Sequence, residues 1–211
     1  SATGLPTWLS LLALLALLAW SLESSAVARL RWIREPGGDA ASAPAIREIL
    51  ALPGEAGREA RLALLDAIRD DGDQRFSGGI LGMLDHGEPQ LMERALLAMA
   101  SVRDPRFIPI LLRHLHVRSS RAAVRDALVD LGAPAQDALE SAMRSATTAP
   151  ATRLHIPRTL CRFGNQRAAD FLTEQLAIDP SRLVRYKVLR GLGRLVADSD
   201  VRVDRKAILG Q

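Results

Sequence analysis

The apolar residues that follow residue 44 recur at helical spacing and then repeat at a longer interval. One series falls near the ends of predicted helices, at intervals of roughly 31 residues: Leu52, Leu84, Leu115, Met143 and Leu176. A second series interleaves with it at a similar interval: Ile68, Ala100, Leu131, Phe163 and Leu192. A further, mostly apolar pair lies three or four positions before each member of the second series, on the same helix face. The pattern predicts five units of about 31 residues, each with two short amphipathic helices.

Residues that break helices separate these predicted elements. They are Gly72, Gly87, Asp104–Pro105, Gly132–Pro134, Gly164 and Asp179–Pro180. A single helix pair cannot bury its own apolar stripe, whereas stacked pairs share one continuous core. We therefore predict an all-α fold, an α-solenoid of about five helix pairs over residues 45–197. The alternative is an irregular helical bundle in which the spacing arises by chance.

An uncharged apolar run, residues 5–22, precedes the repeats. As a helix it would be about 27 Å long, close to the roughly 30 Å hydrocarbon core of a bilayer. Trp8 and Trp20 lie near its ends, where indole rings favour the membrane interface. Three arginines follow it: Arg29, Arg31 and Arg34. By the positive-inside rule, the run predicts a helix in the inner (cytoplasmic) membrane, with the repeats in the cytoplasm.

Two other interpretations of this run remain open. It could be a secretory signal peptide with a small-residue cleavage site at Ala26–Ala28. It could also be a buried core helix, although it is apolar on all sides. Residues 35–44 combine Pro, Gly and small polar residues and predict a linker. The predicted organisation is a membrane helix with flanks at 1–28, a basic juxtamembrane segment and linker at 29–44, a repeat domain at 45–197, and a C-terminal cap or tail at 198–211.

The composition narrows the class of protein further. The 211 residues are 48% hydrophobic and only 4% aromatic, which argues against a β-sandwich or barrel. The single cysteine, Cys161, excludes an internal disulfide framework and a multi-cysteine zinc or iron–sulfur site. Leu, Ala and Arg dominate, and these residues favour helices.

No group of residues carries the pattern of a catalytic or metal site. His114 and His116 are two positions apart, whereas metal-binding helices use steps of three or four. We predict that Cys161 is a buried thiol, although nearby arginines could favour its thiolate. His155 is predicted to cap or pack at a helix start, and the acidic residues at 70–73 to form a solvated turn rather than a calcium loop. The chain is therefore predicted to be no enzyme, with no catalytic residue, metal or cofactor.

Positive charge is concentrated in the last three predicted units. The net charge is +4, and residues 113–194 carry 14 basic and seven acidic residues, against 11 and 13 in residues 29–112. Because successive second helices line one face of a solenoid, these cations predict a shared basic stripe. The candidate partner-binding residues are Arg158, Arg162, Arg182, Arg185, Lys187, Arg190 and Arg194.

Several partners would suit such a stripe. We expect a protein partner, or the membrane domain of the same polypeptide. Anionic lipid head groups or a nucleotide phosphate are possible ligands as well. Nucleic acid is not expected, because aromatic side chains for base stacking are scarce. The alternative is a solvated face of an arginine-rich protein, with pairs such as Asp179 and Arg182 at helical spacing.

The second helices also carry a family resemblance. Residues 121–132 read RAAVRDALVDLG and residues 182–193 read RLVRYKVLRGLG, after Ser-Ser or Asp-Pro starts and each ending on Gly. Over residues 45–197, and most strongly over 105–195, the chain resembles HEAT repeats of the short bacterial type. The resemblance implies an armadillo-like superhelix.

A narrower resemblance lies in residues 155–195. It depends on Ile156–Arg158, Phe163–Gly164 and Leu183–Lys187. This segment is similar to the C-terminal HEAT region of bacterial membrane proteins whose carrier domain resembles nucleotide (ATP/ADP) translocases, which are major-facilitator relatives. The resemblance implies that residues 5–22 would be the last membrane helix of a carrier, and the carrier's transport residues match no position here.

The sequence thus predicts a non-enzymatic, membrane-tethered cytosolic scaffold or a regulatory module that binds a protein partner. One alternative is the C-terminal regulatory portion of a nucleotide-type membrane transporter. Another is a HEAT-fold enzyme of the lyase or DNA glycosylase class, which would need a polar cluster in a concave groove.

Overall fold

The computed structural model describes residues 46–84, 88–198 and 201–203. Every regular element in these ranges is a helix, which confirms the all-α prediction for them. None of these helices is long and apolar enough to cross a membrane. The predicted membrane segment at 5–22, with the rest of 1–28 and the linker at 29–44, lies outside the described residues.

The chain divides into two compact units, residues 1–67 and 68–211. In the first unit, residues 46–51 form a helical turn and α3 (Gly54–Asp71) begins. The Arg61 guanidinium donates a hydrogen bond to the Leu52 carbonyl at 3.0 Å, which holds the two helices together. Leu52 itself is 42% exposed, so the first apolar series does not begin with a buried residue.

The second unit contains the end of α3 and the helices that follow it. Short 3₁₀ turns precede two of them, η1 (Gln74–Phe76) and η2 (Pro105–Phe107). The α-helices are α4 (Ser77–Leu84), α5 (Pro89–Val102), α6 (Ile108–Arg113), α7 (Arg121–Asp130), α8 (Ala133–Arg144), α9 (Pro150–Arg153), α10 (Ile156–Cys161), α11 (Gln166–Ile178) and α12 (Arg182–Asp198).

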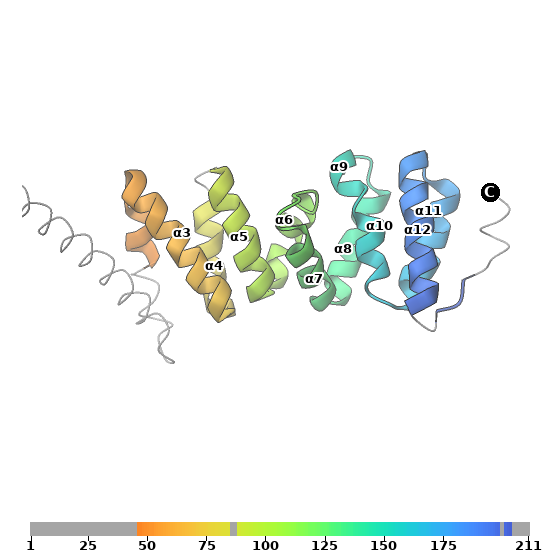
Figure 1. Ribbon diagram of the computed structural model, residues 1–211, viewed down its shortest axis with the longest axis horizontal. Coiled ribbons are helices and arrows are strands. Elements are labelled where there is room, and N and C mark those ends of the chain that lie inside the picture. Colours follow the sequence, from red (N-terminus) through yellow and green to blue (C-terminus); the bar gives the residue numbers. More distant parts are fainter. Residues whose placement is uncertain (1–45, 85–87, 199–200, 204–211) are drawn as a thin grey trace, which may run out of the picture. The chain divides into compact units, whose positions relative to one another are not determined.

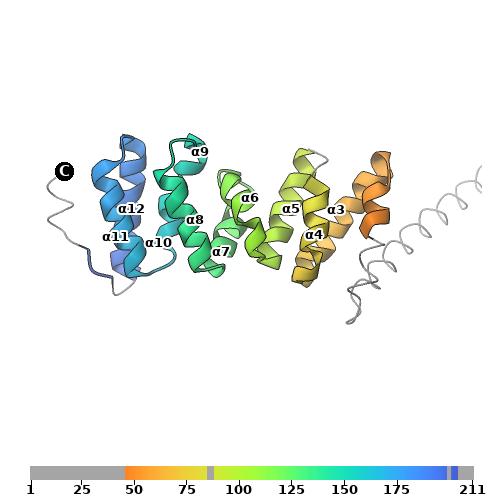
Figure 2. The same cartoon turned by 180° about the vertical axis from the view of Figure 1, so that it is seen from behind.

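These helices form two layers in chain order. In each predicted pair, the first helix contacts the second helix that follows it, as α4 contacts α5 and α11 contacts α12. The second helices also contact one another in succession, in the order α5, α7, α10 and α12. Figure 1 shows this second-helix layer toward the viewer, and Figure 2 shows the layer of α4, α6, α8 and α11 from behind. The arrangement is compatible with an α-solenoid.

A short turn with the same chemistry occurs twice, at Asp73–Phe76 and Asp104–Phe107, one predicted repeat apart. In both copies the Asp carboxylate accepts a hydrogen bond from the backbone N–H two residues later, at 2.9 Å. In both copies the Phe is fully buried. The aspartate satisfies an N–H at the helix start and the phenylalanine anchors that start in the core. This repeated turn is physical support for the predicted repeat period.

The second helices also end in a repeated way, with a residue of positive φ just beyond each helix. These residues are Gly72, Arg103, Gly132 and Gly164. Glycine adopts positive φ at little cost because it has no Cβ, whereas for other residues the cost is about 1–2 kcal/mol. Arg103, with φ of 54°, is the one residue other than glycine in this conformation within the described ranges.

The C-terminal end of the described chain folds back on α11. The Gln166 side chain donates a hydrogen bond to the Arg202 carbonyl at 2.8 Å and accepts one from the Arg202 N–H at 3.0 Å. The outward face of α12 exposes Leu183, Tyr186, Leu189 and Val196. That residues 198–211 form a C-terminal cap or tail stays a prediction, since residues 199–200 and 204–211 lie outside the described part.

Replacing Arg103 by glycine should stabilise the protein by about 0.5–1 kcal/mol, because glycine relieves the left-handed conformation. The exposed Arg103–Asp130 ion pair that is lost contributes little. Gly132→Ala should do the opposite and cost about 1–3 kcal/mol, since its φ of 68° and ψ of −138° suit glycine alone. Chemical denaturation of both variants measures these changes. A destabilised R103G protein would contradict the expectation.

Candidate functional site

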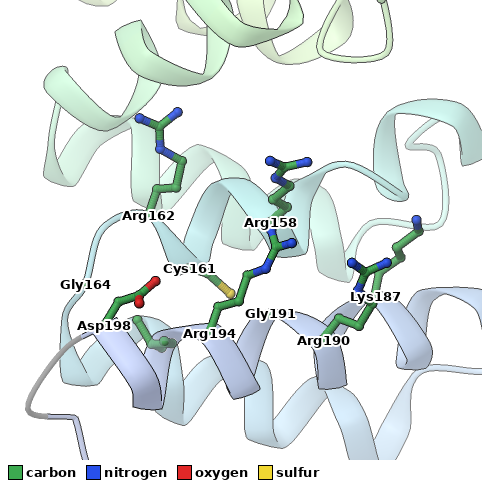
Figure 3. A pocket seen from close by; sticks show the side chains of 10 residues that line it. Arg158, Cys161, Arg162, Gly164, Lys187, Arg190, Gly191, Arg194 and Asp198 are labelled. Atoms are coloured by element: carbon green, nitrogen blue, oxygen red, sulfur yellow. The ribbon is translucent and has the colours of Figure 1, made fainter.

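A cationic groove of about 440 Å³ lies between α10 and α12 in the second-helix layer. Its lining residues are Arg158, Cys161, Arg162, Gly164, Lys187, Arg190, Gly191, Arg194, Leu195 and Asp198. Figure 3 shows the charged side chains around it, with Cys161 between the two helices. We call this the basic groove.

The structure brings five of the seven candidate residues together in the basic groove: Arg158, Arg162, Lys187, Arg190 and Arg194. The other two lie elsewhere on α12 and do not line it. Arg182 is exposed near the start of the helix. Arg185 donates a hydrogen bond to the Asp179 carbonyl at 2.7 Å, which ties it to the preceding turn. The predicted stripe is therefore narrower than the sequence indicates.

Most cations of the groove form no ion pair with a described residue, although one carboxylate, Asp198, lines the groove with them. Within the described ranges, no carboxylate lies within 4 Å of the charged groups of Arg158, Lys187 or Arg194. Arg190 likewise has no carboxylate partner there, and its guanidinium lies 6.0 Å from the centre of the Tyr186 ring. Arg162 is the exception, because it forms an ion pair with Asp126 of α7. The groove thus carries a net positive charge at its surface.

Two arginines of the first-helix layer, on α8 and α11, form ion pairs with carboxylates. Arg167 of α11 binds two carboxylates of α8, Asp137 at 2.5 Å and Glu140 at 2.8 Å. Arg144 faces Glu174 at 3.6 Å. The sequence-based pairing of Asp179 with Arg182 is wrong, since the buried Asp179 forms its ion pair with Arg153 of α9 at 2.8 Å. The alternative interpretation, a solvated face with paired charges, fits helices α8 and α11. It does not fit the basic groove.

A repeated pair of arginines on the second helices escaped the sequence analysis. Arginines four residues apart occur on three successive second helices, at 121 and 125, 158 and 162, and 190 and 194. Residues four apart share one helix face, and the helices that carry these pairs, α7, α10 and α12, contact one another in that order. The R-x-x-x-R pattern is the signal that would have added Arg121 and Arg125 to the candidate residues.

Arg125 of α7 is the most unusual of these arginines because it is only 6% exposed. Its Nε donates a hydrogen bond to the Thr159 hydroxyl at 3.3 Å. No ion pair of Arg125 exists with any described residue. Burial first, and then the positive charges of Arg158, Arg162 and Arg121, lower the pKa of this guanidinium to about 10. A buried cation is thus held among other cations.

Burial and the same group of cations also shift the pKa values of His155 and Cys161. Burial, followed by the cations Arg121, Arg125 and Lys187, lowers the pKa of His155 to about 4. Burial raises the pKa of the Cys161 thiol to about 12, and the charge of Arg194 opposes this only weakly. Cys161 is half-buried, not fully buried as predicted, and its raised pKa makes it a neutral thiol at physiological pH and an unfavourable nucleophile.

The remaining candidate residues have structural explanations. The Nδ1 atoms of His114 and His116 lie 3.0 and 3.1 Å from backbone carbonyls of their own turn. In the part of the chain that the structure describes, no three His, Cys, Asp or Glu residues are grouped so that they could hold a metal ion. Asp73 of the acidic turn caps η1.

Comparison with known proteins adds no further constraint. No protein-family model and no curated protein sequence matches this chain. The class that fold and groove define is an all-helical protein with an exposed cationic groove.

Gly191→Ala should destabilise the protein by about 1–3 kcal/mol through overpacking. A Cβ at position 191 would overlap the Cys161 sulfur, so α12 could no longer approach α10. In a C161A background the same change should be neutral or stabilising by up to about 1 kcal/mol, because alanine favours a helix over glycine. A double-mutant cycle by denaturation measures this coupling. Equal costs in both backgrounds would show that the sulfur contact is unimportant.

Acidification should destabilise the protein between about pH 6.5 and pH 4, partly through His155. The unfolded histidine takes up a proton near its ordinary pKa, whereas the folded one resists until about pH 4, so protons favour the unfolded state in this window. H155Q should reduce the slope of stability against pH there and leave the slope above pH 7 unchanged. Unfolding curves from pH 4 to 8 test this, and identical slopes would contradict it.

Proposed function

We propose that the chain is a non-enzymatic binding module, a membrane-tethered scaffold or regulatory domain whose basic groove holds an acidic segment of a protein partner. In this proposal the helix pairs are a HEAT-like α-solenoid, and residues 5–22 fix the module at a membrane. The proposal places the repeats on the cytoplasmic side, as the arginines after the apolar run favour.

The observation that carries the proposal is the contrast between the two helix layers. In the first-helix layer, Arg144 of α8 and Arg167 of α11 have carboxylate partners, Arg167 at 2.8 Å. Four cations of the basic groove have none among the described residues: Arg158, Lys187, Arg190 and Arg194. Cations that gather around a groove without counter-charges raise the local potential, and that potential attracts and orients an anionic partner.

The dimensions and lining of the groove favour an extended peptide. Its α12 side runs from Lys187 to Asp198, about 16 Å at the helical rise, which an extended segment of about five residues would span. No aromatic side chain lines it, so a nucleic acid or nucleotide base would find no aromatic ring to stack on. Acidic side chains at alternate positions of such a segment would meet the arginines of both helices.

Neutralising three groove arginines should weaken this binding. We expect R158Q/R190Q/R194Q to weaken the affinity for a fluorescein-labelled pentaglutamate peptide by at least about tenfold, since each charge-assisted contact contributes on the order of 1 kcal/mol. Fluorescence anisotropy with the purified 211-residue chain in a non-ionic detergent measures the affinity.

A matched control changes the net charge equally without altering the groove. R113Q/R118Q/R182Q removes three exposed arginines that do not line it. The control should bind the peptide within about twofold of the wild type at about 150 mM salt, where distant surface charges are screened. If both triple variants lose affinity alike, the effect comes from net charge and the groove is not the site.

A further inference from the structure

Arg125 carries a buried charge that forms no ion pair with a described residue, and nearby Asp126 offsets it only weakly. The side chain is 6% exposed, and its Nε–H···Thr159 hydrogen bond of 3.3 Å is its single side-chain hydrogen bond to the described residues. The nearest acidic residue in sequence, Asp126, is occupied by Arg162. Leaving a buried charge unpaired costs several kcal/mol. An anion that reached this side chain would therefore be bound favourably.

The surroundings of Arg125 concentrate positive charge at one place. Arg158 and Arg162 of the adjacent helix α10 both act on it, and repulsion from them contributes to its lowered pKa. In Figure 3 both side chains extend away from α12, and Arg162 pairs with Asp126 on α7. The same two residues line the basic groove. Arg158 and Arg162 therefore belong both to the groove lining and to the electrostatic surroundings of Arg125.

The hydrogen-bonding geometry around Thr159 holds the Arg125 guanidinium in place. Thr159 is fully buried and donates its hydroxyl hydrogen to the His155 carbonyl at 3.0 Å, so its oxygen is oriented to accept from Arg125. Arg121 is committed to the carbonyls of Leu115 and His116 and is less available to a ligand. The terminal nitrogens of Arg125 have no other partner among the described residues and are not fully enclosed.

We propose that Arg125, Arg158 and Arg162 form a phosphoryl-binding site that recognises a phosphorylated side chain within the acidic segment held by the basic groove. This inference rests on the proposed function. A phosphoryl group carries nearly two negative charges and three acceptor oxygens, whereas a carboxylate carries one charge and two oxygens. Guanidinium groups match phosphoryl oxygens with paired N–H donors, and all three residues are arginine.

The chemistry favours a phosphorylated peptide over other phosphate carriers. A nucleotide would place its base against a groove lining without aromatic side chains. Three further cations of the groove, Lys187, Arg190 and Arg194, lie along α12 beyond the phosphoryl site, which suits a chain of acidic residues beside the phosphorylated one. The partner chemistry is thus a phosphoserine or phosphothreonine with acidic neighbours.

The test compares three labelled pentapeptides by fluorescence anisotropy: Glu-Glu-Ser-Glu-Glu, its phosphoserine form, and pentaglutamate. The whole chain in a non-ionic detergent should bind the phosphoserine peptide at least about tenfold more tightly than pentaglutamate, a difference of about 1.4 kcal/mol. Arg125→Met should abolish that preference and change pentaglutamate affinity by less than about twofold. R182Q, outside the groove, should retain the preference.

The outcomes separate the two proposals. If pentaglutamate binds but phosphorylation brings no gain, the phosphoryl site is refuted and the groove proposal stands. If none of the peptides binds, the groove proposal fails as well. Retained preference in R125M would also overturn the inference. Should R125M fail to fold, R125K keeps the charge but loses the paired N–H donors, so it should reduce the preference and leave pentaglutamate affinity unchanged, since Arg125 does not line the groove.

Two further probes test the source of the phosphoryl group. Vesicles of phosphatidylcholine with one fifth phosphatidylinositol bisphosphate should not displace the phosphoserine peptide. ATP should displace it only weakly. Stronger binding of either probe than of the peptide would assign the three arginines to a lipid head group or a nucleotide, and would overturn the peptide assignment.

Discussion

The close approach of α12 to α10 is the constraint on which the groove depends. It is possible because Gly191 has no side chain where the two helices meet, and the Cys161 sulfur fills that space. The approach sets the arginines of both helices around one narrow groove instead of on separate faces. It also partly buries the thiol, and this burial raises the pKa of Cys161 to about 12. One small residue thus determines both the packing and the electrostatics of the last helix pairs.

The charge distribution follows from the two-layer architecture. In the first-helix layer, carboxylates of α8 face arginines of α11, so the charges cancel locally. In the second-helix layer, α7, α10 and α12 present arginines to one another, and Asp126 alone offsets a groove arginine through an ion pair among the described residues. Repulsion between like charges disfavours this arrangement in the free protein. Such a cost is commonly associated with a functional surface, where it increases the gain from binding an opposite charge.

The helical period was accessible from the sequence because local chemistry repeats with it. Apolar steps of three and four gave the all-helical class, and the turns at Asp73 and Asp104 recur at the interval that those steps predict. The basic stripe was predictable only in part, because a count of charged residues does not show in which direction each side chain points. Arg185 turns to the Asp179 carbonyl, whereas Arg190 lines the groove, although both lie on α12.

Arg125 shows why the buried part of the candidate site could not be predicted from the sequence. In the sequence it is one arginine among many, and its neighbours Val124 and Asp126 give no sign of burial. Its environment comes from α10, whose Thr159 lies 34 positions further along the chain. Because burial is a property of helices packed together, an uncompensated charge becomes visible only when both helices are in place. The R-x-x-x-R pairs on successive helices are nevertheless a sequence signal for such a surface, since residues four apart share a face and stacked helices align those faces.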